Sequence, residues 1–106
     1  MTLREICNAA GVSRRAVQGY EKAGLVSALG KNERGHLIYD ENTLERIKQI
    51  KLFQQLGFTI KEIETYIDAP NDILKTTLEE HIQKLKANSE HIEILIDKAH
   101  VLIEKL

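Results

Sequence analysis

The residues best able to do chemistry lie in one short stretch, residues 13–22. If this stretch is a helix, its polar side carries Arg14, Arg15, Gln18 and Lys22. Arginine and glutamine side chains can make paired hydrogen bonds to guanine and adenine edges in the major groove of DNA. The free amide groups at the start of such a helix could also hold a phosphate. The stretch is typical of a helix that reads DNA, and a solvated helix face is the alternative that these residues leave open.

Neither an enzyme nor a metal site is indicated. The histidines are scattered, and no partner at helical spacing would complete a metal site; they are His36, His81, His91 and His100. Cys7 is the only cysteine, which excludes an intramolecular disulfide and the Cys-x-x-Cys metal spacing. Its place among apolar residues indicates a buried thiol rather than a redox sensor. With no acid/base pair and no nucleophile–base set in view, we expect no catalysis, no metal and no cofactor.

The composition is that of one folded domain, and its charge is unevenly distributed. The chain has 106 residues, of which 42% are hydrophobic and 29% charged, and its net charge is −1. Residues 1–51 carry a net +3, whereas residues 68–106 carry a net −3. Such an asymmetry suits a module that binds a polyanion, joined to a part that does not. Because the chain lacks a membrane-length apolar run and a signal-peptide core, we expect a cytoplasmic protein without a membrane partner.

The N-terminal residues predict two short helices. Thr2 and Glu5 have the spacing of a capping box, which predicts a helix from the very start. Gly11 should end that helix, and Ser13 is a good N-cap for the next one. Gly24 should end the second helix in the left-handed conformation. Two short helices joined by a glycine-containing turn are the helix-turn-helix pattern.

Residues 27–39 predict a small hairpin or loop. Its turn-forming residues are Gly30, Asn32 and Gly35, and its β-forming residues are Leu37, Ile38 and Tyr39. Asp40 then caps a third helix over about residues 41–55, which Gly57 ends. The residues expected on the buried side of that helix are Leu44, Ile47, Ile50 and Leu52. A second capping box, Thr59 with Glu62, opens a fourth helix, and Ala69-Pro70-Asn71 breaks the chain.

From Ile73 to Leu106 there is neither glycine nor proline, so a single long helix is predicted, with Asp72 as its cap. Apolar residues recur along it in alternating steps of four and three, which is the pattern of a coiled-coil seam. The interface is expected to contain Leu78, Ile82, Leu85, Ile92, Ile96, Ala99 and Ile103. An amphipathic helix packed on its own domain is the alternative. However, a helix of about 34 residues spans about 50 Å, more than so small a domain can cover.

The chain resembles the MerR family of transcription regulators over about residues 2–67. The matching segments are Leu3, Glu5-Ile6, Ala10-Gly11-Val12-Ser13, Tyr20-Glu21-Lys22-Ala23-Gly24-Leu25, Arg34-Gly35, Tyr39, Leu44-Glu45-Arg46-Ile47 and Leu56-Gly57-Phe58-Thr59-Ile60-Lys61-Glu62-Ile63. The resemblance implies that the long helix pairs with a second copy as an antiparallel coiled coil. It also implies that the dimer binds a near-palindromic promoter and distorts it for RNA polymerase. The contact residues it implies are Arg15, Tyr20, Arg34 and Gly35.

The sequence departs from the family pattern in three places. Gln18-Gly19-Tyr20 stands where the family usually has Arg-Tyr-Tyr, and Gly35-His36-Leu37 stands where it usually has Gly-Tyr-Arg. One frequent phosphate-contacting arginine is thus missing from each element, and Arg14 and His36 could compensate in part. The third departure is that the family's effector domain or cysteine metal loop is not seen after the long helix, as expected either for a short regulator without a ligand or for part of a longer one. We therefore expect no small-molecule or metal effector within this chain.

Together these observations predict an all-α fold: a winged helix-turn-helix domain over residues 1–69 and a coiled-coil dimerisation helix over residues 70–106. The expected function is that of a dimeric, bacterial-type regulator that binds promoter DNA sequence-specifically. The expected DNA contacts are Arg14, Arg15, Gln18, Tyr20, Lys22, Arg34, Gly35 and His36. The alternative is a MerR-like adaptor that binds a protein partner, as chaperone modulators do. The lost basic positions favour the adaptor, whereas the +3 charge opposes it.

Overall fold

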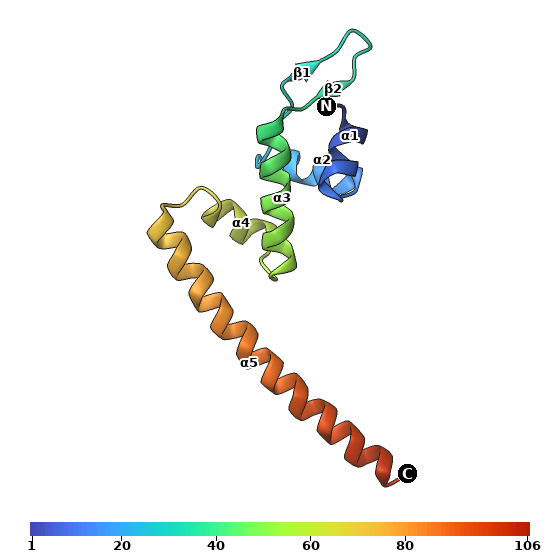
Figure 1. Cartoon of the computed structure of the whole chain (residues 1–106), viewed down its shortest axis with the longest axis vertical. Coiled ribbons are helices and arrows are strands. Elements are labelled where there is room, and N and C mark those ends of the chain that lie inside the picture. The colour runs from blue at the N-terminus through green and yellow to red at the C-terminus, as the bar shows by residue number, and fades with distance from the viewer. The chain divides into compact units, whose positions relative to one another are not determined.

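The computed structural model describes residues 1–106 and contains five helices and one hairpin (Figure 1). The elements in chain order are α1 (Leu3–Ala10), α2 (Arg14–Lys22), β1 (Gly30–Lys31), β2 (Leu37–Ile38), α3 (Glu41–Gln55), α4 (Ile60–Tyr66) and α5 (Asn71–Glu104). They form two compact units, the head (Met1–Asp68) and the tail (Ala69–Leu106). The fold class is therefore the expected one, mostly helical with a small wing. None of the helices is long and apolar enough to span a lipid bilayer.

The ends of the first two helices confirm the predicted caps. Thr2 and Glu5 form the reciprocal capping box at the start of α1. Gly11 ends that helix in the left-handed conformation, with a φ of 67°. The side chain of Ser13 accepts a hydrogen bond from the Ala16 amide at 3.0 Å, and Gly24 follows α2 with a φ of 77°. The helix-turn-helix therefore arises from local signals that the sequence shows directly.

A lysine from α3 completes the turn between α1 and α2. Nζ of Lys51 donates to the carbonyl oxygen of Gly11 at 3.0 Å and to that of Ala10 at 3.4 Å. Carbonyl groups at the end of a helix lack partners within the helix and carry partial negative charge, which a cation stabilises. Lys51 thereby joins α3 to the turn on which the angle between α1 and α2 depends.

The core of the head is built around α3. The residues of the head that are less than 2% exposed are Ile6, Val17, Tyr39, Ile47, Ile50 and Ile63. One expectation for this helix was wrong, because Leu52 is 54% exposed and Phe53 is buried in its place. Residue 53 continues the three-residue step of the buried side after Ile50, whereas residue 52 points away from it. The ring of Phe53 packs edge-to-face on Phe58, with ring centroids 5.3 Å apart.

The wing is a minimal antiparallel hairpin. Gly30 pairs with Ile38 and Lys31 pairs with Leu37, so each strand has only two residues. The side chain of Asn32 holds the turn by accepting from the amides of Arg34 and His36, both at 3.0 Å. In Figure 1 the hairpin lies at one end of α3, next to the start of α1.

The end of the head is fixed by an ion pair. Arg46 of α3 binds both carboxylate oxygens of Asp68 at 2.5 and 2.8 Å, and its Nε donates to the carbonyl oxygen of Leu25 at 3.1 Å. One guanidinium group thus joins α3, the segment after α2 and the segment after α4. Such a bidentate geometry adds both energy and orientation to an arginine–carboxylate pair.

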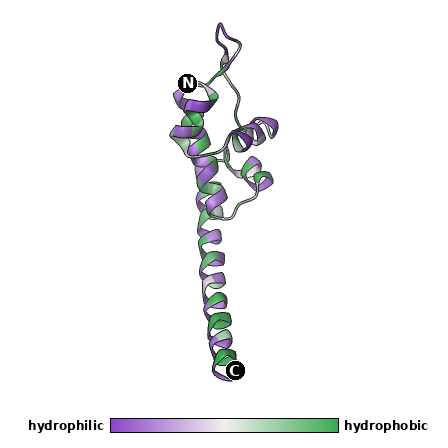
Figure 2. Cartoon of the chain, turned by 90° about the vertical axis from the view of Figure 1, so that its right-hand side faces the viewer, coloured by the Kyte–Doolittle hydropathy of each residue, from purple (hydrophilic) through white to green (hydrophobic).

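The tail is a single helix of 34 residues with no buried side chain. Its N-cap is Pro70, which makes no side-chain cap, so the expectation that Asp72 caps this helix was wrong. Asp72 lies instead in the first turn, where its negative charge is favourable. Figure 2 shows hydrophobic residues recurring along α5 between hydrophilic ones. The large apolar residues that this helix leaves exposed are Ile73, Ile82, Leu85, Ile92, Ile94, Leu95, Ile96, Val101, Leu102 and Ile103.

Two glycines of the helix-turn-helix should respond in opposite ways to substitution by alanine. Gly11→Ala should lower the free energy of unfolding by roughly 1 kcal/mol, because a side chain disfavours the left-handed backbone. The added Cβ would also lie 2.9 Å from Nζ of Lys51 and displace that contact. Gly19→Ala should raise the free energy of unfolding by roughly 0.5–1 kcal/mol, because Gly19 lies inside α2 and nothing lies within 4 Å of an added Cβ. Urea denaturation measures both, and a shift of the same sign in the two variants would contradict this account.

Candidate nucleic-acid interface

The two sides of α2 have different surroundings. Val17 is fully buried and Tyr20 is 3% exposed, so this side of the helix packs on the core of the head. The polar residues expected to contact DNA are all exposed on this helix; they are Arg14, Arg15, Gln18 and Lys22. A helix anchored by its apolar side and presenting a row of long polar side chains has the form required to enter a major groove.

Tyr20 lies differently from the other residues expected to contact DNA. Its hydroxyl donates to Oε1 of Gln54 on α3 at 2.6 Å, and burial raises the pKa of this phenol. The ring therefore belongs to the contact between α2 and α3, where it stabilises the position of α2. The other seven expected contact residues, including Arg34, Gly35 and His36 of the wing, are exposed.

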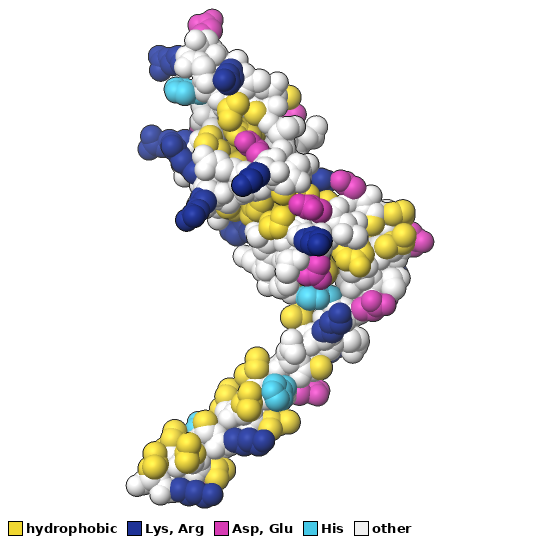
Figure 3. Space-filling view, turned by 180° about the vertical axis from the view of Figure 1, so that it is seen from behind, with side chains coloured by type: hydrophobic (Ala, Val, Ile, Leu, Met, Phe, Trp, Pro, Cys, Tyr) yellow, Lys and Arg dark blue, Asp and Glu magenta, His cyan; other side chains and the backbone are white.

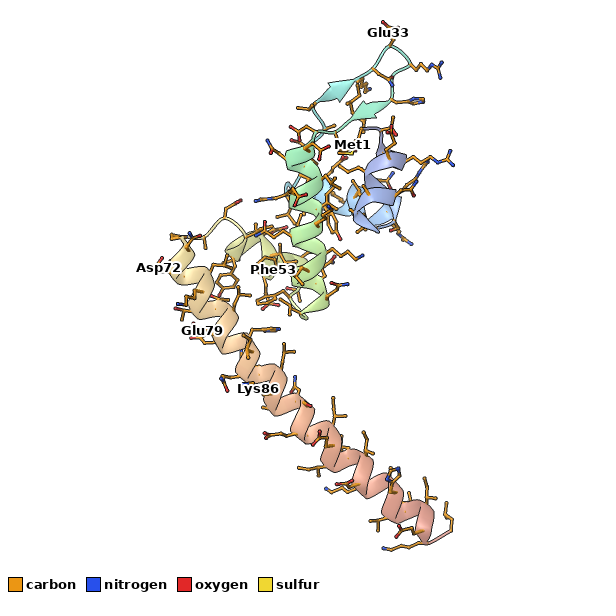
Figure 4. The ribbon with its side chains drawn as sticks, viewed as in Figure 1. Met1, Glu33, Phe53, Asp72, Glu79 and Lys86 are labelled. Carbon is orange, nitrogen blue, oxygen red and sulfur yellow. The ribbon has the colours of Figure 1, made fainter.

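The wing is held in place by Tyr39, at the end of β2. Its amide donates to the carbonyl oxygen of Met1 at 2.6 Å, and the Met1 nitrogen donates to the Tyr39 carbonyl oxygen at 2.7 Å. Thr2 and Ile38 form a further antiparallel bridge beside this pair. The Tyr39 ring is 1% exposed, and its hydroxyl donates to a carboxylate oxygen of Glu21 on α2. Figure 4 shows the result, with Met1 at the base of the hairpin and Glu33 at its tip.

Between the wing and the helix-turn-helix lies an open groove of about 480 Å³, which we call the wing groove. It is lined by Thr2, Leu3, Arg4, Arg14, Gly35, His36 and Leu37. Three of these side chains carry or can carry positive charge, and none is acidic. Figure 3 shows Lys and Arg side chains gathered along one side of the upper part of the molecule, together with a histidine. The structure thus brings one wing residue, His36, and one α2 residue, Arg14, to the same depression.

Sequence reasoning did not identify Arg4 as part of this surface. Arg4 lies on α1, which the helix-turn-helix pattern treats as a supporting helix, and it is 32 positions before His36 in the chain. The pairing of Met1 with Tyr39 and the bridge of Thr2 with Ile38 bring the start of α1 and the wing together. The nearest signal in the sequence is the capping box, which fixes where α1 starts but not what lies beside it.

Neither the single cysteine nor a metal-binding cluster provides a further site. Cys7 is buried as expected, and burial raises the pKa of its thiol, which makes it a poor nucleophile and metal ligand. No group of three or more His, Cys, Asp and Glu side chains could hold a metal ion. The exposed polar side of α2 and the wing groove therefore form the candidate functional site.

Known protein families match both parts of the chain. A family model described as "MerR HTH family regulatory protein" matches residues 1–70, and one described as "MerR, DNA binding" matches residues 44–106. The nodulation protein NolA of Bradyrhizobium sp. (strain NC92) is 31% identical over 102 residues, which are 96% of this chain and 40% of that protein. The chain thus spans about two fifths of the length of this curated relative.

Solved structures share the fold. The N-terminal part of the Bacillus subtilis multidrug transporter activator, MtaN, matches with a TM-score of 0.81 at 24% identity, covering 97% of both chains. HiNmlR, described as a MerR family regulator lacking the sensor domain and bound to promoter DNA, matches with a TM-score of 0.71 at 18% identity. That match covers 92% of this chain and 78% of HiNmlR.

Replacing Tyr39 by phenylalanine should loosen the wing and change the response to alkaline pH. Burial, and then Glu21, raise the pKa of this phenol above its ordinary value of 10.0, so it stays protonated in the folded chain. The protonated Tyr39 hydroxyl therefore stabilises the fold fully below about pH 10, and this stabilisation is lost as the pH rises further. We expect Tyr39→Phe to lower the free energy of unfolding by roughly 1–3 kcal/mol at pH 7 and to reduce the loss above pH 10.

Denaturation of wild type and variant between pH 7 and 11 measures both effects. Tyr66→Phe is the matched control, because no hydrogen bond of the Tyr66 hydroxyl stabilises the head. Tyr20 and Cys7, whose pKa values are also raised by burial, contribute to the alkaline loss that remains in the variant. An alkaline profile that is the same with and without the Tyr39 hydroxyl would show that its contact with Glu21 contributes nothing.

Proposed function

This chain belongs to the MerR HTH family of regulatory proteins, and from that premise we propose that it binds promoter DNA as a homodimer and regulates transcription. The observation that carries the proposal is the exposed polar side of α2, flanked by a wing fixed to the same core. HiNmlR, which shares the fold, is described as bound to promoter DNA. The comparisons give no support to a protein-binding adaptor, and the family is one of regulators rather than enzymes.

The positions of the exposed side chains along α2 support different DNA-contacting roles for them. Arg14 and Arg15 lie in the first turn, which is the part of a recognition helix that reaches the bases, and Gln18 lies one turn later. Arg15 and Gln18 are of the types that read guanine and adenine. Lys22 lies in the last turn, where a cation also complements the helix dipole. We propose that Arg15 and Gln18 contact bases and that Lys22 contacts a phosphate.

The wing and the tail complete the proposal. Arg34, Gly35 and His36 are exposed on the hairpin and would contact the DNA backbone beside the major groove. The apolar side of α5 would pair with a second copy in an antiparallel coiled coil, since a patch this large is rarely left exposed. Two heads on one such dimer would bind a near-palindromic site and distort it for RNA polymerase. A protein with this role would act in the cytoplasm, on the chromosome.

Arg15→Ala tests whether α2 reads sequence. If Arg15 contacts a base, its loss should cost roughly 1–3 kcal/mol on the preferred site and much less on unrelated DNA. Because a dimer makes each contact twice, the effect on a palindrome can be up to double. Duplexes selected from random DNA by the wild type provide the preferred site, and fluorescence anisotropy provides the affinities.

Lys61→Ala is the control for this experiment, because Lys61 is an exposed cation on α4, which belongs to neither α2 nor the wing. Its affinity should equal that of the wild type. Wild-type binding that is the same on all sequences, and that does not respond to Arg15→Ala, would refute sequence reading by α2.

Placing charges on the seam of α5 tests the dimer. Ile92 and Ile96 are 55% and 49% exposed in the single chain and would be buried in the coiled coil. Ile92→Asp with Ile96→Asp should give monomers in analytical ultracentrifugation, because two carboxylates would enter an apolar interface. The control adds the same two charges to the other side of the helix, at Gln83 and Ala87, and should remain dimeric. A seam variant that dimerises as tightly as the control would mean that the interface lies elsewhere.

A further inference from the structure

The wing groove has the charge of a binding site for an anion. Arg4, Arg14 and His36 come from three different elements, and all three side chains are exposed. The ion pairs of the chain, Arg46 with Asp68 and Lys48 with Glu45, involve none of them. Arginine has a planar fork of donors that matches a phosphate oxygen pair, so two arginines beside one groove favour a phosphate over a single carboxylate.

Two acidic residues, Glu5 of α1 and Glu33 of the hairpin, do not line the wing groove. The carboxylate of Glu5 accepts hydrogen bonds from the amide and the hydroxyl of Thr2, at 3.2 and 3.0 Å, and so is committed to the cap of α1. These hydrogen bonds hold the pKa of Glu5 below its ordinary value. Glu33 lies at the tip of the hairpin, away from its base (Figure 4). Neither carboxylate lines the groove.

The shape and the lining of the wing groove narrow the class of ligand. Its volume of about 480 Å³ is far larger than the roughly 30 Å³ that one water occupies, so a phosphate with attached groups fits. Leu3 and Leu37 are half-buried and give part of the lining an apolar character. Gly35 adds no side chain, which leaves the backbone of the wing accessible. Cations beside apolar groups suit a phosphodiester, whose sugars are less polar than its phosphate.

We propose that the wing groove binds one backbone phosphodiester of the DNA, with Arg4 of α1 and Arg14 of α2 holding the phosphate and His36 on the wing side. The proposal rests on the proposed function and adds to it a contact from α1. In this arrangement Arg4 is a DNA-binding residue that carries no sequence information. The DNA is then held on both sides of α2, which fixes the depth at which Arg15 meets the bases.

The salt dependence of binding by the full chain tests the groove. Each phosphate contact contributes about 0.9 to the slope of log affinity against log salt, so Arg4→Ala should lower the slope of a dimer by about 1.8. Between 50 and 200 mM salt the wild type should therefore lose about tenfold more affinity than the variant. The loss should be the same on selected and unrelated duplexes. Arg4→Lys, which retains the charge, should restore most of the slope, and Lys61→Ala should leave it unchanged.

Titration with inorganic phosphate provides a measurement that needs no DNA. The amide NMR signals of Arg4 and Gly35 should shift with phosphate in the wild type and not in Arg4→Ala, and the Gly57 signal should stay still in both. An unchanged salt slope for Arg4→Ala, while Arg15→Ala still alters sequence preference, would refute the groove and leave the proposed function standing. Conversely, sequence-independent binding with a slope that depends on Arg4 would refute sequence reading and support the groove.

Discussion

The site depends on the contacts of Tyr39, the buried residue at the end of the wing. A hairpin with two residues in each strand cannot hold its own position, because so short a ladder is marginal in water. Tyr39 supplies what the strands lack: its backbone pairs with Met1, and its hydroxyl binds Glu21 on α2. One buried aromatic residue thereby places the wing, the start of α1 and the end of α2 in one body. The exposed residues that flank α2 have a defined position only because of this connection.

Most of the fold could be predicted because its signals are local. The caps at Thr2, Ser13, Asp40 and Thr59 are all present where the sequence placed them, since each depends only on the N-cap side chain and the amide three residues later. The helix-turn-helix follows from those caps and from the two glycines that end α1 and α2. The expectation that Leu52 is buried was wrong because apolar residues occur on more than one side of α3. The local pattern does not decide which of these sides is buried.

The candidate site was less predictable because it depends on long-range contacts. Tyr20 lies on the same helix as Arg15, and only the position of Gln54 on α3 shows that its hydroxyl is bound within the head. Nine basic residues lie in the first half of the chain, and the three of them on α3 bind partners within the head. Arg46 binds Asp68, Lys48 pairs with Glu45, and Lys51 caps α1. The remaining six lie on α1, α2 and the wing, so the positive charge is more concentrated than the sequence count indicates.

The absence of any buried side chain on α5 bears on how long the protein would survive in a cell. A long helix with no fully buried side chain is only marginally stable, so the 34 residues of α5 gain most of their stability from whatever covers their exposed apolar side. In the proposed dimer that cover is a second copy, and helix formation is then linked to protein concentration by mass action. Chains below the dissociation constant would expose an unprotected segment to proteases. Turnover would remove unpaired copies first, so the amount of active regulator would rise more steeply than its rate of synthesis.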